Sequence, residues 1–173
     1  MKQKTLLLMS GPSGAGKSYW VKNFIKDRPN AIWVSRDAVR FSMVSENEKY
    51  FSKENDVFKE WIRQIQEALD SEGEGWVIAD ATHLNERSRN KTLDALILDD
   101  DIQIIPVFSY PGVQKCLENN EKRYGRAYVP RSVIRRMAMN YEPPVDGEKY
   151  KYYSILEIVE KGDFIKDEKK ECQ

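Results

Sequence analysis

The sequence contains few of the side chains that form disulfides or bind zinc. Its 173 residues include two cysteines and one histidine. Cys116 and Cys172 are widely separated, so they make neither a disulfide framework nor a metal cluster. With His83 as the single histidine, we do not expect a zinc site. This cysteine usage fits a reducing compartment, and we expect the protein to be cytoplasmic.

Net charge and long apolar runs are also lacking. The 28 Lys and Arg residues balance 28 Asp and Glu residues, so the protein is not a general polyanion binder and any basic surface must be local. No apolar run approaches the roughly 18 residues of a membrane span, and the first residues lack the apolar stretch of a secretory signal. We therefore expect no membrane partner and, from the length, one domain over residues 1–173.

The most informative stretch follows a short apolar run at residues 6–9. It reads Gly-Pro-Ser-Gly-Ala-Gly-Lys-Ser over residues 11–18, a complete phosphate-binding loop pattern. Glycines let backbone N–H groups wrap around phosphate oxygens, and the helix that follows directs its positive dipole end at them. The expected strand before the loop and helix after it favour this interpretation over a plain glycine turn. We expect ATP and Mg²⁺ to bind here.

The residues of this loop divide the work of holding the nucleotide. Lys17 is placed to reach the β- and γ-phosphates and to act in catalysis, and the Ser18 hydroxyl is placed to ligate Mg²⁺. The predicted nucleotide-binding residues of the loop are Gly11, Pro12, Ser13, Gly14, Ala15, Gly16, Lys17 and Ser18.

Apolar runs alternate with segments of helical periodicity along most of the chain. This alternation predicts an α/β fold with a parallel sheet and helices on both faces. Strands are expected at residues 6–9, 31–35, 76–80, 102–108 and 153–159. Helices are expected after the loop to about residue 25, from residue 36, and at 53–69, 85–97, 113–123 and 131–141.

Single residues refine three of these elements. Asn85 is expected to cap a helix whose apolar stripe is Leu93, Leu96 and Ile97. Pro106 indicates that its strand is irregular or lies near an edge of the sheet. The charged tail from residue 162 is expected to fray.

Carboxylates follow the second and third predicted strands where each one ends. Ligands of open α/β sheets bind outside these strand ends, so Asp37 and Asp80 are expected beside the phosphate loop. Asp37 and Arg40 share a face of a helical turn, where the carboxylate could accept the proton of an attacking hydroxyl and Arg40 could hold a substrate phosphate. A surface ion pair is the alternative. Asp80 resembles the carboxylate that supports Mg²⁺, and Ala81 after it disfavours a motor or switch ATPase.

A basic segment lies between residues 113 and 136. Seven Lys and Arg residues there face two Glu residues in an otherwise neutral protein: Lys115, Lys122, Arg123, Arg126, Arg131, Arg135 and Arg136 against Glu118 and Glu121. Arginines of this segment could close over the nucleotide and neutralise charge on the transferred phosphoryl group. Arg123 and Arg126 are the stronger candidates, whereas the arginines from 131 on fit a solvated helix face. His83 either touches substrate or is incidental.

Four elements, in order along the chain, resemble the 5′-hydroxyl polynucleotide kinase family, best known from the kinase module of bacteriophage polynucleotide kinases. They are the loop at 11–18, Ser35-Arg36-Asp37-x-x-Arg40, Asp80-Ala-Thr82-x-Leu84-Asn85, and Asn120-x-x-Arg123-x-x-Arg126-x-x-Val129-Pro130. The resemblance implies an adenylate-kinase-like P-loop fold with five parallel strands and a helical lid at about 113–141. It also implies transfer of the γ-phosphate of ATP to a 5′-hydroxyl end of DNA or RNA.

The resemblance assigns a role to each matching residue. It makes Asp37 the general base and Arg40 the ligand of the acceptor's neighbouring phosphate, with Asp80 and Thr82 near the acceptor. Asp80 would position Arg40 or the water shell of the metal ion. Arg123, with Arg126, would clamp the ATP phosphates from the lid.

Three departures from the family pattern accompany the match. The lid loop is a residue longer than in the phage enzymes, which leaves open which arginine is the clamp. His83 stands where asparagine is common. The Asp-x-Asp-x-Thr pattern of the phosphatase domain that many relatives carry does not occur, so we expect an enzyme that only adds phosphate.

Two other functions fit the same motifs. The first is a kinase acting on a nucleoside, a sugar or a modified base, which would share the loop, Asp37 and the lid. The second is a non-catalytic ATP-binding switch, against which the acceptor carboxylate Asp37 argues.

Overall fold

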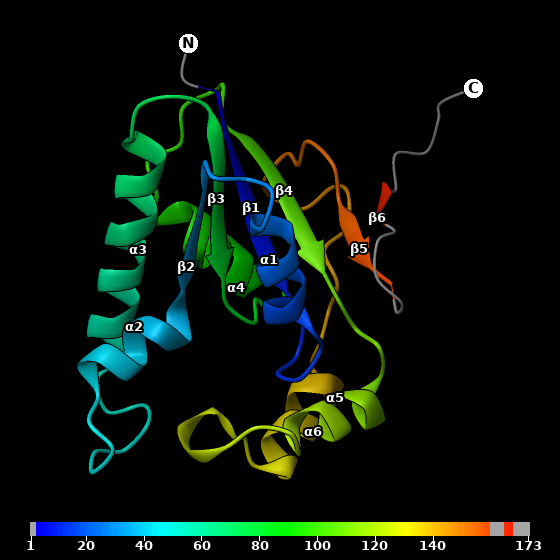
Figure 1. Cartoon of the computed structure of the whole chain (residues 1–173). Helices are drawn as coiled ribbons and strands as arrows, with labels where there is room; N and C mark the ends of the chain where they lie inside the picture. The colour runs from blue at the N-terminus through cyan, green and yellow to red at the C-terminus, as the bar shows by residue number, and fades with distance from the viewer. Residues whose placement is uncertain (1–2, 160–164, 168–173) are drawn as a thin grey trace.

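The computed structural model describes residues 3–159 and 165–167. It forms a single twisted sheet with helices on both faces and a group of short helices below the ends of the strands (Figure 1). The strand order is β2-β3-β1-β4-β5-β6, in which the first five strands are parallel and β6 is antiparallel to β5. The strands are β1 Lys4–Ser10, β2 Ala31–Ser35, β3 Gly75–Asp80, β4 Gln103–Phe108, β5 Leu156–Ile158 and β6 Ile165–Asp167.

Alternation along the central strand β1 builds a core on each side of the sheet. Leu6 and Leu8 are buried on one face, in a cluster that includes Trp61. Leu7 and Met9 are buried on the other face, in a second cluster. Because neighbouring residues of a strand point to opposite faces, an unbroken apolar run is what a strand covered on both sides requires.

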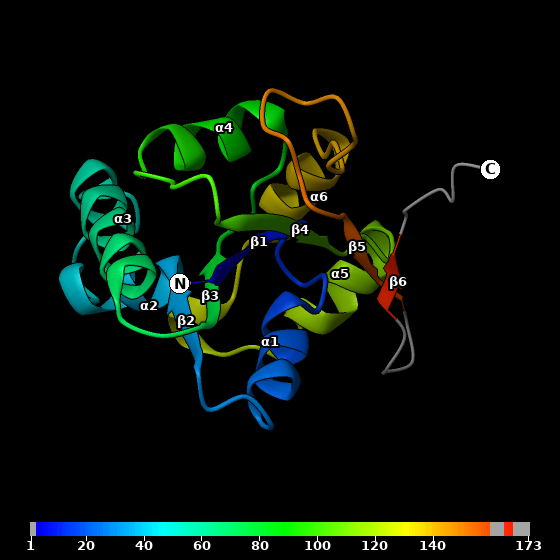
Figure 2. The ribbon, with the colours of Figure 1, turned by 90° about the horizontal axis from the view of Figure 1, so that it is seen from above.

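The helices lie on both faces of this sheet and at one end of it. In Figure 2, α1 lies on one face of the sheet and α4 on the other; α3 packs on the same face as α4, through Trp61 in the cluster of Leu6 and Leu8. The helices α5 and α6, joined by the 3₁₀ turn η1, lie at the end of the sheet where the phosphate loop is found (Figure 1). The helices are α1 Lys17–Ile25, α2 Arg36–Met43, α3 Glu54–Asp70, α4 Glu86–Asp94, α5 Val113–Asn120, η1 Gly125–Ala127 and α6 Arg131–Met139. None of the helices in the described part of the chain is long and apolar enough to cross a membrane.

This α/β P-loop arrangement is the predicted fold, with the five parallel strands in the order 2-3-1-4-5. Asn85 caps α4 as expected, because its side chain accepts the Ser88 N–H at 2.9 Å. The antiparallel β6 was not predicted. The tail from residue 162 was predicted to fray. Apart from β6, its residues 162–164 and 168–173 lie outside the described part.

Two details of the prediction were wrong. The helix α4 ends at Asp94, so Ile97 lies beyond it and is exposed instead of completing an apolar stripe. Pro106 sits inside the sheet, between β1 and β5. The backbone groups of residues two apart on a strand point toward the same neighbouring strand. The Ile104 carbonyl accepts the Tyr153 N–H on the β5 side. The missing N–H of Pro106 faces that side, where β5 pairs only with Val107 and Phe108, so no ladder bond is lost.

A buried ion pair fastens the segment after α6 to α4. Arg89 and Glu148 are 1% and 3% exposed, and the Arg89 Nη2 lies 2.5 Å from the Glu148 Oε1. Arg89 also donates to the carbonyls of His83 and Glu142, at 3.1 and 2.9 Å. The Tyr152 hydroxyl completes the cluster with a bond of 2.6 Å to the Glu148 carboxylate. This segment therefore braces the turn that follows β3.

We expect Glu148→Ala to lower the free energy of unfolding by about 3–5 kcal/mol, because it leaves the Arg89 charge buried without its partner. Urea unfolding followed by circular dichroism measures the change. Lys149→Ala is the control, since Lys149 pairs with Asp94 on the surface and its loss should have little effect. Equal losses in the two variants would contradict a structural role for the buried pair.

Candidate active site

Hydrogen bonds from neighbouring segments to the backbone of the phosphate loop fix the loop from several directions. Three of them are Gly11 N–H to the Thr82 carbonyl at 2.8 Å, Ser109 Oγ to the Ala15 carbonyl at 2.6 Å and Asn119 Nδ2 to the Gly14 carbonyl at 2.8 Å. These partners come from the loops after β3 and β4 and from α5. The loop is therefore held in shape by the elements around it.

Two glycines of the loop allow this close approach. Gly11 and Gly14 have φ angles of 146° and 85°, which residues with side chains rarely adopt. A Cβ at Gly11 would collide with the Ser109 carbonyl, and one at Gly14 with the Cys116 carbonyl. The pattern of glycines that identified the loop thus has a steric cause in its surroundings.

Lys17 lies at the centre of the site. It is the first residue of α1 and is buried, and its Nζ donates to the carbonyls of Gly11 at 2.8 Å and Pro12 at 3.0 Å. Burial lowers the pKa of Lys17, and the charge of Arg123 lowers it further, whereas Asp80 and Asp37 act in the opposite direction. The side chains singled out at the ends of β2 and β3 thus act electrostatically on the lysine of the loop.

A pocket of about 380 Å³ opens next to Lys17. It is lined by the loop, by the first turn of α1 and by the end of α5: Gly14, Gly16, Lys17, Ser18, Tyr19, Asn119, Lys122 and Arg123. Backbone N–H groups at a helix start together with three cationic side chains suit a polyphosphate. The residues present therefore fit a nucleotide triphosphate.

Asp37 occupies the first turn of α2, directly after β2. The Ser35 side chain caps this helix by accepting the Ala38 N–H at 3.2 Å, so the chain turns from strand to helix where the sheet ends. Asp37 remains 63% exposed. Its Oδ1 accepts bonds from Arg40 Nη1 at 2.5 Å and from the Tyr50 hydroxyl at 2.9 Å. An accessible carboxylate with a fixed orientation can receive a proton from a bound hydroxyl.

Arg40 is held more tightly than a surface ion pair would be. Its side chain is 6% exposed, and its Nη2 donates to both Glu54 carboxylate oxygens at 3.0 Å. Its Nη1 donates to Asp37 and to the Tyr50 hydroxyl. The guanidinium also lies 4.6 Å from the centre of the Tyr50 ring. The expected spacing of Asp37 and Arg40 on one helical face is present, and Arg40 orients Asp37.

Glu54 and Tyr50 are parts of the site that sequence reasoning missed. Glu54 starts α3 and also accepts a bond of 2.5 Å from Arg36 Nη2, so it joins two arginines of α2. Burial and the nearby Asp37 charge raise the pKa of Tyr50 to about 12, which keeps its hydroxyl a donor. No local pattern in the sequence distinguishes Glu54 from the other acidic residues of α3, such as Asp56 and Glu60.

Asp80 lies at the end of β3, beside Ser35 of β2 in the sheet register. It is buried, and its Oδ2 accepts the Trp33 indole N–H at 2.9 Å. Burial raises the pKa of Asp80, although the Lys17 charge opposes that effect. Among the described residues, Asp80 makes no bond to Arg40, so the predicted support of Arg40 comes from Glu54 instead.

The two lid arginines point to different halves of the site. Arg123 lines the nucleotide pocket, as expected for a phosphate clamp. Arg126, in η1, donates to the carbonyls of Val44 and Phe41 and lies 4.7 Å from the centre of the Phe41 ring. It therefore joins the lid to α2, away from the loop. Farther along, Arg131 forms an exposed ion pair with Glu121 at 2.7 Å, in line with a solvated helix face.

His83 belongs to the core rather than to the substrate site. It is buried, its Nδ1 lies 2.6 Å from the Met9 carbonyl and its Nε2 lies 2.9 Å from Thr92 Oγ1. Because a carbonyl can only accept, Nδ1 carries the proton. The φ of 39° at His83 forms the turn after β3. His83 therefore has a structural role in the turn after β3, which neither of the two predicted alternatives described.

The described residues contain no group of three His, Cys, Asp or Glu side chains that could hold a metal ion by themselves. Mg²⁺ in kinases is bound through one or two protein groups together with the phosphates of the nucleotide. The Ser18 hydroxyl, in the exposed first turn of α1, and Asp80 fit that arrangement. The site therefore suits a magnesium ion that arrives with its nucleotide.

Comparison with known families agrees with this geometry. A family model described as an AAA domain matches residues 6–144, which include the loop, both carboxylates and the lid. The chain belongs to this family. Its adenylate-kinase-like fold and its phosphate loop imply that it binds ATP, usually with Mg²⁺. No curated protein sequence matches the chain.

Several solved structures share the fold of this chain at low sequence identity. A chain of the Pnkp1/Rnl/Hen1 RNA repair complex has a TM-score of 0.68 and 22% identity; the match covers 81% of our chain but 44% of that one. A fungal RNA kinase has a TM-score of 0.63 and 15% identity; the match covers 95% of our chain and 78% of that one. A gluconokinase from Sinorhizobium meliloti 1021 has a TM-score of 0.57 and 18% identity; the match covers 93% of our chain and 86% of that one. The chain thus spans less than half the length of the first of these neighbours.

The buried histidine predicts a pH dependence of stability. Burial lowers the pKa of His83 to about 3 in the folded protein, against about 6.5 in an unfolded chain. The unfolded state therefore binds more protons below pH 6.5, and His83 alone should remove about 2 kcal/mol of stability between pH 7 and pH 5.

Urea unfolding of the wild type and of His83→Asn at both pH values tests this. Asparagine tolerates the positive φ and does not titrate, so the variant should lose less stability on acidification even if it is weaker at pH 7. An identical loss in both proteins would contradict the buried neutral histidine.

Proposed function

We propose that this protein transfers the γ-phosphate of ATP to the 5′-hydroxyl end of DNA or RNA. The observation that carries the proposal is the exposed Asp37 carboxylate. Arg40 and Tyr50 hold it by hydrogen bonds in the first turn of α2, directly after β2. The fold shared with an RNA kinase and with a chain of an RNA repair complex supports a nucleic-acid acceptor. The fold shared with a gluconokinase keeps a small hydroxyl acceptor as the competing possibility.

The donor half is assigned to the loop and to one side of the lid. The loop N–H groups, Lys17 and Arg123 would hold the polyphosphate, while Ser18 and, through water, Asp80 would hold Mg²⁺. ATP with its magnesium ion supplies an electrophilic phosphorus and a stabilised leaving group. Lys17 is freed for this task only by exchanging its bonds to the Gly11 and Pro12 carbonyls for bonds to phosphate.

The acceptor half is assigned to α2. The acceptor's hydroxyl oxygen forms a bond to the γ-phosphorus, the bond from that phosphorus to the bridging oxygen breaks, and the hydroxyl proton passes to an Asp37 oxygen. Arg40 and Tyr50 hold the carboxylate so that its free oxygen faces the acceptor. An acceptor phosphate would have to compete with Glu54 for the Arg40 guanidinium. We therefore assign Arg40 first to positioning Asp37.

Removal of the base should slow transfer strongly without abolishing nucleotide binding. Asp37→Ala and Asp37→Asn should reduce kcat about 10²- to 10⁴-fold, measured with γ-labelled ATP and a 5′-hydroxyl oligonucleotide. Affinity for ATP, measured by calorimetry, should remain because the loop, Lys17 and Arg123 are intact. Loss of ATP binding in a folded Asp37 variant would refute its assignment as the general base.

A panel of acceptors separates the competing functions. It contains the 5′-hydroxyl oligonucleotide, the same strand already 5′-phosphorylated, nucleosides with and without a 3′-phosphate, and gluconate. Label on the first acceptor alone supports the proposal. Label on the phosphorylated strand would indicate a base or an internal hydroxyl, label on a nucleoside or gluconate a small-molecule kinase, and label on none a nucleotide switch.

The two lid arginines should differ in their effects. Arg123→Ala should lower kcat by about 10³-fold or more, the scale of an arginine that neutralises transition-state charge. Arg126→Ala removes contacts to the carbonyls of α2 and should act more weakly, through the position of the acceptor half. Steady-state kinetics with varied ATP and varied acceptor distinguish them, and a larger kcat loss in Arg126→Ala would reverse the assignment.

A further inference from the structure

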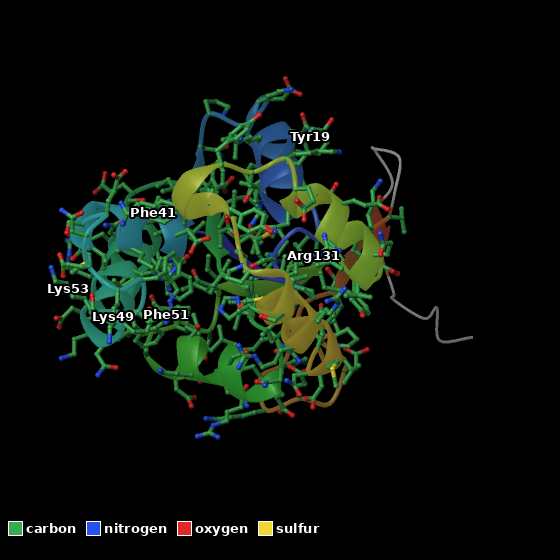
Figure 3. All side chains as sticks on the ribbon, turned by 90° about the horizontal axis from the view of Figure 1, so that it is seen from below. Tyr19, Phe41, Lys49, Phe51, Lys53 and Arg131 are labelled. Carbon is green, nitrogen blue, oxygen red and sulfur yellow. The ribbon has the colours of Figure 1, made fainter. Side chains whose placement is uncertain are left out.

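Three aromatic rings form a wall beside the proposed base. Phe41 comes from α2 and Phe51 from the segment before α3 (Figure 3). Tyr50 precedes Phe51 in that segment. The Tyr50 ring lies edge-on to both neighbours, with centroid distances of 6.2 Å to Phe41 and 4.7 Å to Phe51. Since the Tyr50 hydroxyl bonds to Asp37, this aromatic wall adjoins the carboxylate that faces the acceptor.

Phe51 differs from the other two members of the wall. Phe41 and Tyr50 are partly buried, whereas Phe51 is 64% exposed. The Arg40 guanidinium carbon lies 5.5 Å from the centre of the Phe51 ring, and the Tyr50 ring contacts it at an interplanar angle of 84°. These contacts fix the ring on its inner side and leave much of its surface open to solvent.

An isolated exposed phenylalanine needs no functional explanation. Phe51, however, contacts the side chains of Arg40 and Tyr50, which are the two side chains that hold Asp37. Its position is therefore fixed with respect to the acceptor hydroxyl. A ring that flanks a reacting hydroxyl at a fixed place and exposes its surface is suited to stacking on a planar group attached to the acceptor.

We propose that Phe51 stacks on the nucleobase of the acceptor's 5′-terminal nucleotide and so selects acceptors that carry a base. This inference rests on the proposed function and narrows its substrate class. A sugar acid without a planar group gains nothing from the ring, whereas every nucleobase has a face that can stack.

The test uses two single-stranded oligonucleotides that differ only at the 5′-terminal nucleotide, which is normal in one and abasic in the other. Both offer a 5′-hydroxyl. For the wild type, kcat/KM should be about 5- to 100-fold lower on the abasic strand, the scale of one base–aromatic stack. Phe51→Leu, which keeps apolar bulk but has no ring, should show the same loss on the normal strand and little further loss on the abasic one.

Two further variants complete the comparison. Phe51→Trp should retain activity on the normal strand, and KM for ATP should be unchanged in all variants. The matched control is Ile97→Ala, at a large apolar side chain that is 77% exposed in the loop after α4. It should match the wild type on both strands.

Each alternative result has a distinct meaning. Unchanged kinetics of Phe51→Leu on the normal strand would overturn the stacking role and leave the kinase function intact. Equal losses on the normal and abasic strands would overturn it as well, by reducing Phe51 to a support for Tyr50. If the wild type phosphorylates neither strand, the proposed function itself fails, whatever the variants do.

Discussion

The phosphate loop holds its shape because at two positions it packs directly against the backbone of its neighbours, where only glycine fits. Gly11 and Gly14 each approach a carbonyl so closely that a single added carbon would collide with it. The carbonyls belong to the loop after β4 and to α5, so the loop, the central sheet and the start of the lid are packed as one unit. A loop fixed in this way needs little reorganisation to bind an anion, which is the condition for strong electrostatic stabilisation. The positions of Lys17 and Arg123 depend on the same packing.

The parts of the fold that depend on local pattern could be predicted from the sequence. The apolar run at residues 6–9 and the glycine loop after it specify a buried strand and a helix start, and both are present. Asn85 could be identified as a cap because capping uses residues only three positions apart. Pro106 misled the prediction, since its effect depends on which neighbour the strand faces at that residue. That fact belongs to sheet order and not to the local sequence.

The candidate site divides in the same way. Asp37 and Arg40 share a helical face through their spacing, so their pairing could be expected. Glu54 holds Arg40 from a different helix. The start of that helix could be predicted, but its contact with Arg40 depends on how α3 packs against α2, which no local pattern specifies. His83 could not be assigned from the sequence, which left a substrate contact and an incidental position as alternatives. Its buried bonds to Met9 and Thr92 can be recognised only when β1 and α4 are in place.

The structure separates the lid into two contacts with different consequences. Arg123 lies in the nucleotide pocket, whereas Arg126 reaches the carbonyls of α2 next to the aromatic wall. The two residues are three positions apart, so one short turn of the chain contacts both the nucleotide pocket and the segment that carries Asp37. Asp37 is in turn held by Arg40 and Tyr50. The spacing between the nucleotide pocket and the Asp37 carboxylate therefore depends on this turn as well as on the strand ends, and a precise spacing of this kind is what in-line transfer between two bound groups requires.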